Sequence, residues 1–557
     1  MSGARVAVRE RVTADERSAP GGGRSEAVLL VVSTVLCLAP FVAKPLHLDD
    51  PLFYWEARQI AAHPLDPYGF TVNWYVRPEP MAAVTRNPPG ASYYLAVAGT
   101  LLGWSPVALH AAFLLPAVAV VVGTWALGRR LCRQPVLPAL LVLTSPGFLV
   151  SATSLMSDVP MLALWLLATV LWLEGIERDR PGLLAVAGIA AAACVLTKYP
   201  GAGVVPLLVV YALARRGWGR WTVALAPTLV LVLAYQYWSA TAYGQGHLVD
   251  SFTYAEKERE PASLHGALVA LAFVGGALPA MAALLPFVAD GRTTAIVAAV
   301  GAAAGTLVVS AGRTWWDAGR TVDVWWPIGL HFAVFVAAGA AIVALAARDL
   351  ARRRDAAAVV LALWVVGIVV FAGFVNWMAN VRSVLPAIPA AALLVARALD
   401  DRRVLPMVVP ATLVASLALA IWIAVGDYQI ARAQVRAADL VVARTANRSG
   451  MLWFQGHWGF QAAMEERGGR AVDAVESRFF PGDVLVVPRT NTNVLPLPRD
   501  MPARSERLEI PIAAGGTTIC GRCGAGFYSS LWGPLPYRID PPPPERYDVV
   551  DVLPGGP

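Results

Sequence analysis

Residues 356–375 read AAAVVLALWVVGIVVFAGFV, a run of twenty positions without one charged side chain. A helix of about 20 apolar residues is long enough to cross the hydrocarbon core of a bilayer. The whole chain has 557 residues, of which 57% are hydrophobic and 15% charged, and this is too apolar for a soluble protein of that length. The sequence therefore predicts an integral membrane protein.

Similar apolar segments recur along the chain and predict an α-helical polytopic fold with about thirteen transmembrane helices. They begin near residues 27, 106, 136, 159, 182, 201, 221, 264, 294, 327, 356, 384 and 404. Arginine-rich connections alternate with connections that hold fewer cations; the basic ones are 129–130, 178–180, 215–216, 348–354 and 397–403. Because basic connections remain in the cytoplasm, we expect a multi-pass plasma membrane protein with its N-terminus inside.

This topology divides the chain into three expected parts. Residues 1–26 form a cytoplasmic tail, residues 27–426 the transmembrane domain with a first outer loop at 44–105, and residues 427–557 an extracytoplasmic domain. The turn and strand pattern of Ser477 to Pro488 predicts that the last part is a small α/β domain. The prolines at 541–544 predict an irregular tail.

Composition also bears on the partners and cofactors. The formal charge of +7 does not indicate nucleic acid, since the Lys and Arg residues lie in short clusters between apolar stretches. No P-loop or dinucleotide fingerprint is present. No His, Cys or carboxylate cluster has metal-ligand spacing, so we expect activity without a tightly bound metal.

The densest group of polar side chains follows the first span, in His47-Leu48-Asp49-Asp50-Pro51. Pro51 suits the first turn of a helix, so Asp50 is expected to cap that helix and Asp49 to point into a site. The alternative is that both aspartates only cap and solvate the loop. The helix is predicted to be amphipathic, with Glu56 on a polar face and an apolar face of Phe53, Ala57, Ile60 and Ala61.

A second acid, Asp158, stands at the outer start of the fourth span. Its alternative role is again a helix cap. The predicted topology brings Asp49 and Asp158 to the same membrane surface, together with the cations Arg86, Lys198 and Arg382. These cations are candidates for binding a phosphate, and the alternative for each is a lipid-headgroup anchor.

Two features of the predicted outer domain stand out. Cys520-Gly521-Arg522-Cys523 lies on the oxidising side of the membrane, so a local disulfide is expected in preference to free thiols. The aromatic segment Leu452 to Phe460 either contacts a glycan or packs inside the small domain.

Several short motifs together resemble the GT-C membrane glycosyltransferases, particularly bacterial relatives of protein O-mannosyltransferases and of the lipid A aminoarabinose transferase, in the glycosyltransferase 39 and 83 group. These motifs are Asp49-Asp50-Pro51, Asn87-Pro88-Pro89-Gly90 with Tyr93-Tyr94, Leu155 to Pro160 with Asp158, Leu196-Thr197-Lys198-Tyr199-Pro200-Gly201, and Arg382 to Pro389. They occur in the family's order over roughly the first 400 residues.

The resemblance implies an inverting enzyme that takes a sugar from a polyprenyl-phosphate donor and passes it to a glycan, lipid or protein acceptor at the outer face. It implies that Asp49 is the catalytic base, that Asp158 supports it, and that Lys198 or Arg382 faces the donor phosphate. Many relatives carry Lys or His where this chain has Asn87, and neighbouring Arg86 is the candidate to compensate. Supporting roles are assigned to Asp50, Glu56, Asn87 and Tyr93. A transporter or flippase of lipid-linked sugars and a non-catalytic assembly protein are the alternative functions.

Overall fold

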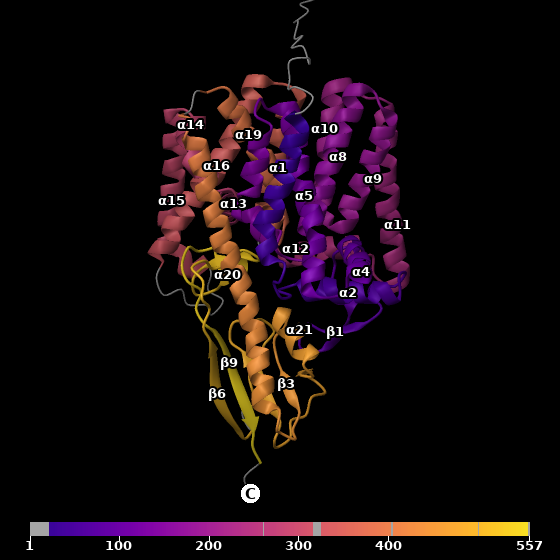
Figure 1. The fold of residues 1–557 in the computed structure, drawn as a ribbon, viewed down its shortest axis with the longest axis vertical. Helices are drawn as coiled ribbons and strands as arrows, with labels where there is room; N and C mark the ends of the chain where they lie inside the picture. The colour runs from indigo at the N-terminus through magenta and orange to yellow at the C-terminus, as the bar shows by residue number, and fades with distance from the viewer. Residues whose placement is uncertain (1–21, 260, 316–324, 403–404, 499–500, 555–557) are drawn as a thin grey trace, which may run out of the picture.

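The protein consists of a helical bundle and a small sheet-containing domain joined by one long helix (Figure 1). The computed structural model describes residues 22–259, 261–315, 325–402, 405–498 and 501–554. Most of the predicted cytoplasmic tail lies outside these residues. The predicted fold class, a polytopic helical membrane protein with a C-terminal α/β domain, is confirmed.

Each of the thirteen apolar segments predicted from the sequence contains at least one helix. The helices of the bundle are α1 (Gly22–Leu38), α5 (Pro106–Leu131), α6 (Val136–Leu143), α7 (Pro146–Ser151), α8 (Asp158–Arg178), α9 (Pro181–Thr197), α10 (Val204–Arg216), α11 (Ala226–Tyr243), α13 (Leu264–Ala277), α14 (Ala280–Val288), α15 (Gly291–Trp315), α16 (Trp326–Arg353), α17 (Ala356–Val370), α19 (Ala387–Asp400) and α20 (Val408–Thr445). In the described part of the chain, eight helices are long and apolar enough to cross a membrane. The pair α13 and α14, bent by 91°, makes a ninth if it is one span. The remaining segments are shorter, so the count of thirteen spans stays a prediction.

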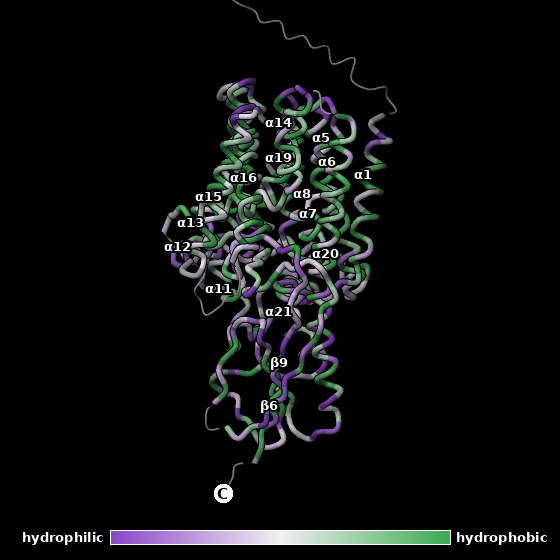
Figure 2. The backbone as a smooth tube through the Cα atoms, turned by 90° about the vertical axis from the view of Figure 1, so that its left-hand side faces the viewer, coloured by the Kyte–Doolittle hydropathy of each residue, from purple (hydrophilic) through white to green (hydrophobic). Residues whose placement is uncertain are grey.

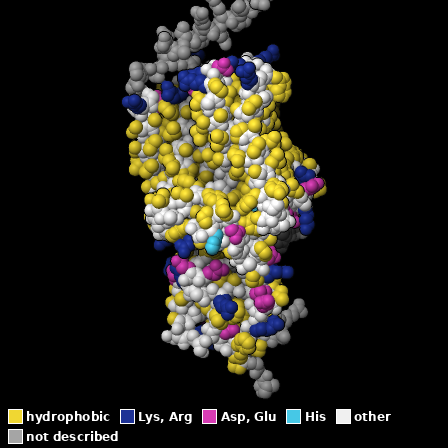
Figure 3. Space-filling view, turned by 90° about the vertical axis from the view of Figure 1, so that its right-hand side faces the viewer, with side chains coloured by type: hydrophobic (Ala, Val, Ile, Leu, Met, Phe, Trp, Pro, Cys, Tyr) yellow, Lys and Arg dark blue, Asp and Glu magenta, His cyan; other side chains and the backbone are white. Residues whose placement is uncertain are grey.

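Hydrophobic residues predominate along the bundle (Figure 2), and Lys and Arg side chains gather at its end farthest from the C-terminal domain (Figure 3). The arginine-rich connections meet at this end. Arg130 pairs there with Glu177 at 2.5 Å, and Arg397 pairs with Asp349 at 3.0 Å. The predicted cytoplasmic connections therefore lie together at one end of the bundle, as expected if they all face the same side of the membrane.

Residues 44–105, the predicted first outer loop, form a layer of short elements at the opposite end of the bundle (Figure 1). They are α2 (Asp50–Ala62), β1 (Thr71–Asn73), β2 (Pro78–Pro80), α3 (Met81–Val84) and α4 (Gly90–Leu102), joined by α12 (His247–Glu258) from a later connection. β1 and β2 pair antiparallel, with Val72 opposite Glu79. This layer lies between the bundle and the C-terminal domain.

The C-terminal domain contains a mixed sheet of five strands with the order β4-β3-β5-β9-β6. Its elements are β3 (Leu452–Phe454), α21 (Trp458–Glu466), β4 (Arg470–Ala471), β5 (Val484–Pro488), β6 (Ala503–Ile510) and β9 (Glu545–Val552). β3 runs parallel to β4 and β5, whereas β9 pairs antiparallel with β5 and β6. The prediction of an irregular tail is wrong for residues 545–552. These residues form an inner strand, because Tyr547, Val550 and Val552 are buried in the sheet.

Helix α20 runs through the predicted domain boundary at residue 427 without a break. The bundle and the C-terminal domain therefore share one continuous helix. A loop after β6 also returns to the bundle, where the Val381 amide donates to the Phe527 carbonyl and the Ser530 amide to the Ala379 carbonyl. The predicted disulfide between Cys520 and Cys523 is confirmed and closes a short turn of this loop.

Candidate active site

Two acids and two cations predicted from the sequence meet at the end of the bundle that faces the C-terminal domain. Arg382 Nη1 lies 3.1 Å from Asp49 Oδ2, and Lys198 Nζ lies 2.5 Å from Asp158 Oδ1. The charges of Asp49 and Asp158 both act on Arg382, and that of Arg382 acts on Lys198. The four side chains therefore form one alternating cluster of charges, called the acid–base cluster below.

Helix packing explains how Asp158 and Lys198 come together. Asp158 is the first residue of α8, and Lys198 directly follows the last residue of α9. α8 and α9 are joined by a short turn at Asp179 and Arg180 and pack along each other. The start of the first helix and the end of the second consequently lie at the same level of the bundle.

Asp49 follows a tight turn near the start of the first outer loop. Leu48, which is buried, has a φ of 49°, and this left-handed conformation is uncommon for a residue other than glycine. Asp49 follows as the residue before α2, and its side chain makes no capping hydrogen bond to that helix. The carboxylate is therefore free to contact Arg382.

The predicted capping role of Asp50 is wrong. α2 begins at Asp50 itself, and the buried carboxylate accepts hydrogen bonds from the amides of His47 and Leu155 at 3.0 and 2.9 Å. Burial raises the pKa of Asp50 to about 7, although the charge of Lys44 and these two amides oppose the shift. Asp50 thus ties the first outer loop to the segment that precedes Asp158, and this contact between distant residues leaves no local sequence pattern.

The predicted polar face of α2 is also wrong at Glu56. This side chain is 1% exposed, and its carboxyl accepts a hydrogen bond from Ser92 Oγ of α4 at 2.6 Å. Ala61, expected on the buried face, is exposed. α2 packs against α4, so the side that faces α4 is buried. Burial raises the pKa of Glu56 to about 8 despite the hydrogen bonds from Ser92 and Thr85.

Burial and charge act against each other on the cations of the acid–base cluster. Burial opposes the charge of Arg382, but Asp49 and Asp158 outweigh it, so the pKa of the guanidinium is raised. For Lys198, burial prevails over the attraction of Asp158, and its pKa is lowered. Arg382 is therefore a permanent cation, whereas Lys198 depends on its carboxylate partner.

The other predicted site residues lie farther from the acid–base cluster. Arg86 pairs with Asp250 of α12 at 2.7 Å and stacks 4.2 Å from the ring centre of Tyr254. The backbone carbonyl of Asn87 accepts the Tyr68 hydroxyl at 2.8 Å. Tyr93 donates to the Pro64 carbonyl within the outer loop. Arg86 and Asn87 thus fix α12 and the loop around the site, and Tyr93 closes the loop at its exposed edge.

Two of the motifs touch each other, which accounts for a glycine in one of them. A Cβ atom at Gly90 would lie 2.7 Å from the carbonyl oxygen of Leu196. Real Cβ atoms do not approach so closely, so any larger residue would push the start of α4 away from the end of α9. The Asn87–Gly90 motif thereby supports the segment that carries Lys198.

The structure adds a buried charged group that sequence reasoning missed. Lys44 Nζ lies 2.5 Å from Asp427 Oδ2, and both side chains are fully buried. Thr518 and Tyr528 of the returning loop donate to the same carboxylate at 2.6 and 2.8 Å. The sequence did contain a signal for this pair, because an ionisable residue such as Asp427 within an apolar helix usually has a buried partner. The expected span ended at 426, so Asp427 was assigned to the outer domain.

The returning loop reaches the acid–base cluster through Tyr528. The guanidinium carbon of Arg382 lies 5.6 Å from the centre of the Tyr528 ring. Tyr528 therefore contacts Arg382 with its ring and Asp427 with its hydroxyl. A cation over an aromatic face is attracted to it, so this contact helps to fix the position of Arg382.

The C-terminal domain also contributes His457, from the aromatic segment Leu452 to Phe460. Its ring lies 4.6 Å from that of Trp74 in the first outer loop. Burial lowers the pKa of His457 to about 4, against the attraction of the Asp49 charge. Phe454 and Phe460 are fully buried, so this part of the segment packs inside the domain, whereas His457 lies close enough to Asp49 for the charge of that acid to act on it.

Within the described ranges, no group of three or more His, Cys, Asp or Glu side chains is arranged to hold a metal ion. The expectation of metal-independent activity stays a prediction.

Residues 86–241 match the family model described as dolichyl-phosphate-mannose-protein mannosyltransferase. This segment contains three of the five motifs and the Asp158–Lys198 pair, and the predicted resemblance to membrane glycosyltransferases is confirmed over it. Asp49 and Arg382 lie outside the matched residues. No curated protein sequence matches the chain.

A comparison with solved structures matches the chain to three proteins at low sequence identity. ArnT from Cupriavidus metallidurans bound to undecaprenyl phosphate is 15% identical with a TM-score of 0.44, over 85% of this chain and 94% of that chain. The arabinofuranosyltransferase AftD from Mycobacteria is 14% identical with a TM-score of 0.43, over 97% of this chain and 40% of that chain. Arabinosyltransferase EmbB from Mycobacterium smegmatis is 16% identical with a TM-score of 0.34, over 83% of this chain and 44% of that chain. Identities this low assign no role to an individual residue.

Proposed function

We propose that this membrane protein is an inverting glycosyltransferase that moves a sugar from a polyprenyl-phosphate donor to an acceptor at the outer surface of the membrane. The observation that carries the proposal is the acid–base cluster, in which Asp49 and Asp158 lie with Arg382 and Lys198 at one end of the bundle. The match of residues 86–241 to a mannosyltransferase family supports glycosyl transfer.

Asp49 is the proposed catalytic base. Its side chain is 34% exposed, whereas Asp158 is 2% exposed and bonded to Lys198, so Asp49 is the acid that an acceptor can reach. As the acceptor oxygen or nitrogen bonds to the anomeric carbon, its proton passes to the Asp49 carboxylate. The bond from that carbon to the donor phosphate breaks on the opposite side, which inverts the anomeric configuration.

Arg382 and Lys198 are the proposed partners of the departing phosphate. The breaking bond leaves negative charge on the phosphate oxygens, and fixed cations in a site with little water stabilise that charge. Both cations are now held by carboxylates, so they are oriented before a donor arrives. Asp158 is then a positioning residue that keeps Lys198 charged and in place.

Arg86 is assigned to the outer edge of the donor site. It is paired with Asp250 and stacked on Tyr254, and its charge acts on Tyr75, which also feels the charge of Asp49. Tyr75 is therefore within electrostatic range of both Arg86 and the proposed base. This arrangement supports Arg86 as the cation that replaces the Lys or His expected in relatives at position 87.

The C-terminal domain is proposed to complete the site on the outer side. Tyr528 supports Arg382, and His457 approaches Asp49, and both residues follow the last transmembrane segment. Truncation near residue 430 would cut α20 and remove both. We therefore expect the membrane part alone to lose transfer, and a protein that still transferred sugar without this domain would contradict its role here.

The deciding experiment compares Asp49→Asn with Asp66→Asn, a matched change in the same outer loop, where Asp66 accepts the Tyr243 hydroxyl at an exposed site. Both variants are assayed for transfer from a polyprenyl-phosphate sugar by membranes from cells that lack the native gene. Asp49→Asn should reduce transfer about 100- to 10,000-fold with normal protein level and donor binding, since the base is gone and the shape is kept. Full transfer by Asp49→Asn would discard the mechanism and leave a transporter of lipid-linked sugars as the better reading.

A further inference from the structure

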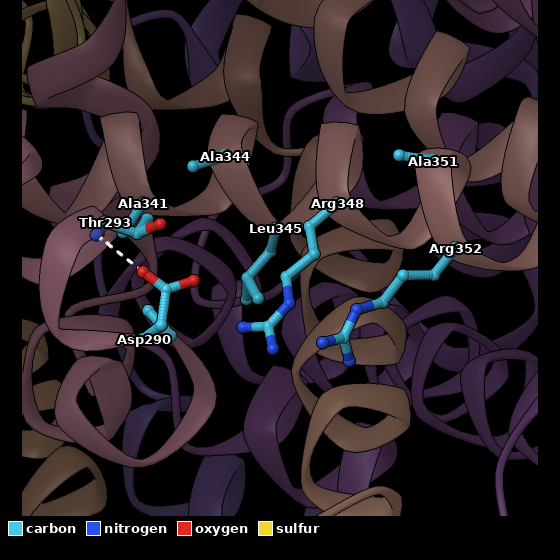
Figure 4. Close-up of a pocket in the computed structure, with 9 residues that line it drawn as sticks. Asp290, Thr293, Ala341, Ala344, Leu345, Arg348, Ala351 and Arg352 are labelled. Carbon is cyan, nitrogen blue, oxygen red and sulfur yellow. Dashed lines mark hydrogen bonds between the residues drawn. The ribbon is translucent and has the colours of Figure 1, made fainter.

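A cavity of about 330 Å³ opens at the end of the bundle opposite the acid–base cluster. Its walls come from the end of α14, the start of α15 and the last turns of α16 (Figure 4). Arg348 and Arg352 point into it, over an apolar wall formed by Ala341, Ala344 and Leu345. A smaller space of about 30 Å³, lined also by Arg402, adjoins it.

The cavity lies far from the acid–base cluster. Ile328, near the start of α16, packs against the returning loop at Gly524. Arg348 lies twenty residues farther along the same helix, which corresponds to about 30 Å at 1.5 Å per residue. A ligand bound here would not be the sugar donor in its reactive position.

The carboxylates around the cavity are already engaged. Asp290 accepts the Thr293 amide at 2.8 Å and so caps α15, as the dashed line in Figure 4 shows. Asp349 pairs with Arg353 and Arg397, and Asp401 pairs with Arg353. Asp349 and Asp401 are therefore neutralised by other arginines, whereas Asp290 caps a helix and keeps its charge near Arg348.

Three arginines at the cavity lack such a partner. Among the residues that the structure describes, Arg348, Arg352 and Arg402 form no ion pair. The charges of Arg352 and Arg402 repel Arg348, and those of Asp290 and Asp401 attract it from a longer range. Arg348 donates to the Val288 carbonyl, which orients one edge of its guanidinium and leaves the rest open. Asp290 and Asp401 offset part of the repulsion among the three cations, and an anion bound between the guanidinium groups offsets more of it.

We propose that this cavity, called the arginine cavity below, binds a phosphate-bearing anion. Guanidinium groups match phosphate oxygens in geometry and charge, and two arginines one helical turn apart can hold one phosphate together. The chemistry is shared by an anionic phospholipid headgroup and a soluble phosphate. The alanine-rich wall and the position at the end of the hydrophobic bundle favour the lipid, whose chain can follow α15 and α16.

The test uses the full-length protein with Arg348→Gln/Arg352→Gln as the variant. The control is Arg178→Gln/Arg180→Gln, which removes two positive charges at the same end, where Arg178 is exposed and pairs with Glu174. Native mass spectrometry measures how many molecules of phosphatidylglycerol or phosphatidylcholine remain bound to each protein. A second measurement follows the unfolding temperature of each protein with and without inorganic phosphate. Wild-type protein and the control should retain phosphatidylglycerol, and the arginine-cavity variant should bind it about thirtyfold more weakly, at about 1 kcal/mol per arginine near a membrane surface.

The arms distinguish the two sources of phosphate. If wild-type protein retains phosphatidylglycerol and the arginine-cavity variant does not, the ligand is a lipid headgroup. If only inorganic phosphate stabilises wild-type protein, the ligand is a soluble anion. Equal binding by the variant and the control, or no binding of either anion to wild-type protein, would overturn the proposal. Arg402→Gln serves as a second variant if the double change prevents folding, and it should weaken binding in the same direction.

Discussion

Arg382 Nη1 lies 3.1 Å from Asp49 Oδ2, although 333 positions separate the two residues in the chain. The contact brings the start of the first outer loop to the turn before α19. It places the proposed base beside the proposed phosphate ligand. The charge of one side chain thereby sets the orientation of the other before any substrate is present.

Replacing Arg382 should impair transfer more than replacing any exposed cation nearby. Arg382→Gln removes a fixed charge from the departing phosphate and frees Asp49, so we expect a loss of about 100- to 1,000-fold in kcat/KM. Arg382→Lys should recover part of this loss, because Lys keeps the charge but lacks the planar fork. Arg259→Gln, which only removes a hydrogen bond to the Phe374 carbonyl, is the control. Equal activity of all three variants would show that Arg382 takes no part in the transfer reaction.

The buried pair of Lys44 and Asp427 should govern stability. Asp427→Asn leaves the Lys44 ammonium buried without a counter-charge, which costs about 3–5 kcal/mol in comparable cases. Thermal unfolding in detergent should show a large fall for this variant and little change for Asp439→Asn, an exposed pair on the same helix. The double change Lys44→Met/Asp427→Leu should unfold at a higher temperature than Asp427→Asn, because it removes both charges together. If the double variant were no more stable than Asp427→Asn, the buried charge would not be the cause.

Glu56 should make the stability of the protein depend on pH. Its pKa is raised by burial from 4.5 to about 8, so the folded protein binds this proton more tightly than the unfolded chain does. The contribution of this proton to the free energy of unfolding therefore falls as the pH rises between these two values. Above the higher value the contribution is gone, and Glu56 causes no further change with pH. Glu56→Gln does not titrate, so its unfolding temperature should resemble that of wild-type protein near pH 5 and exceed it at pH 9. The unfolding temperature of the control Glu79→Gln should change with pH as that of wild-type protein does. If the difference in unfolding temperature between Glu56→Gln and wild-type protein did not grow with pH, Glu56 would not be the group responsible.

The proposed topology requires the basic connections and the acid–base cluster to face opposite sides of the membrane. Reporter fusions at residues 130, 215, 350 and 400 should report the cytoplasm, and fusions near 250 and 450 the outer side. The clustering of Arg130 with Glu177 and of Arg397 with Asp349 at one end of the bundle agrees with this assignment. A cytoplasmic signal near 450 would place the C-terminal domain and the proposed site inside the cell, and donor transfer at the outer face would have to be abandoned.

Local patterns in the sequence predicted the helices and the disulfide well. Twenty apolar residues without a charge have few stable states other than a membrane-spanning helix, since every backbone group must be paired inside lipid. The proximity of Asp158 and Lys198 could also be predicted from the sequence. Two consecutive spans place their outer ends at the same level, so their proximity follows from topology alone.

The same patterns failed where a long-range contact decides the environment of a side chain. Glu56 has the spacing of a polar helix face but is buried against Ser92, and Asp50 binds a backbone amide 105 positions away. Residues 545–552 follow four prolines and look like a tail, yet they complete a sheet with strands from earlier in the domain. Nothing within a few residues of these positions signals the partner.

The sequence by itself determined that this chain lies in a membrane, where its helices run and which acids and cations share a surface, because periodicity and charge act over a few residues at a time. Only the tertiary structure decided that Asp49 meets Arg382, that Asp427 is buried with Lys44, and that Tyr528 reaches the site from the far end of the chain. These contacts join segments hundreds of residues apart. They arise from the packing of α20 and the returning loop against the first outer loop, where burying charged groups is favourable only if each finds its partner.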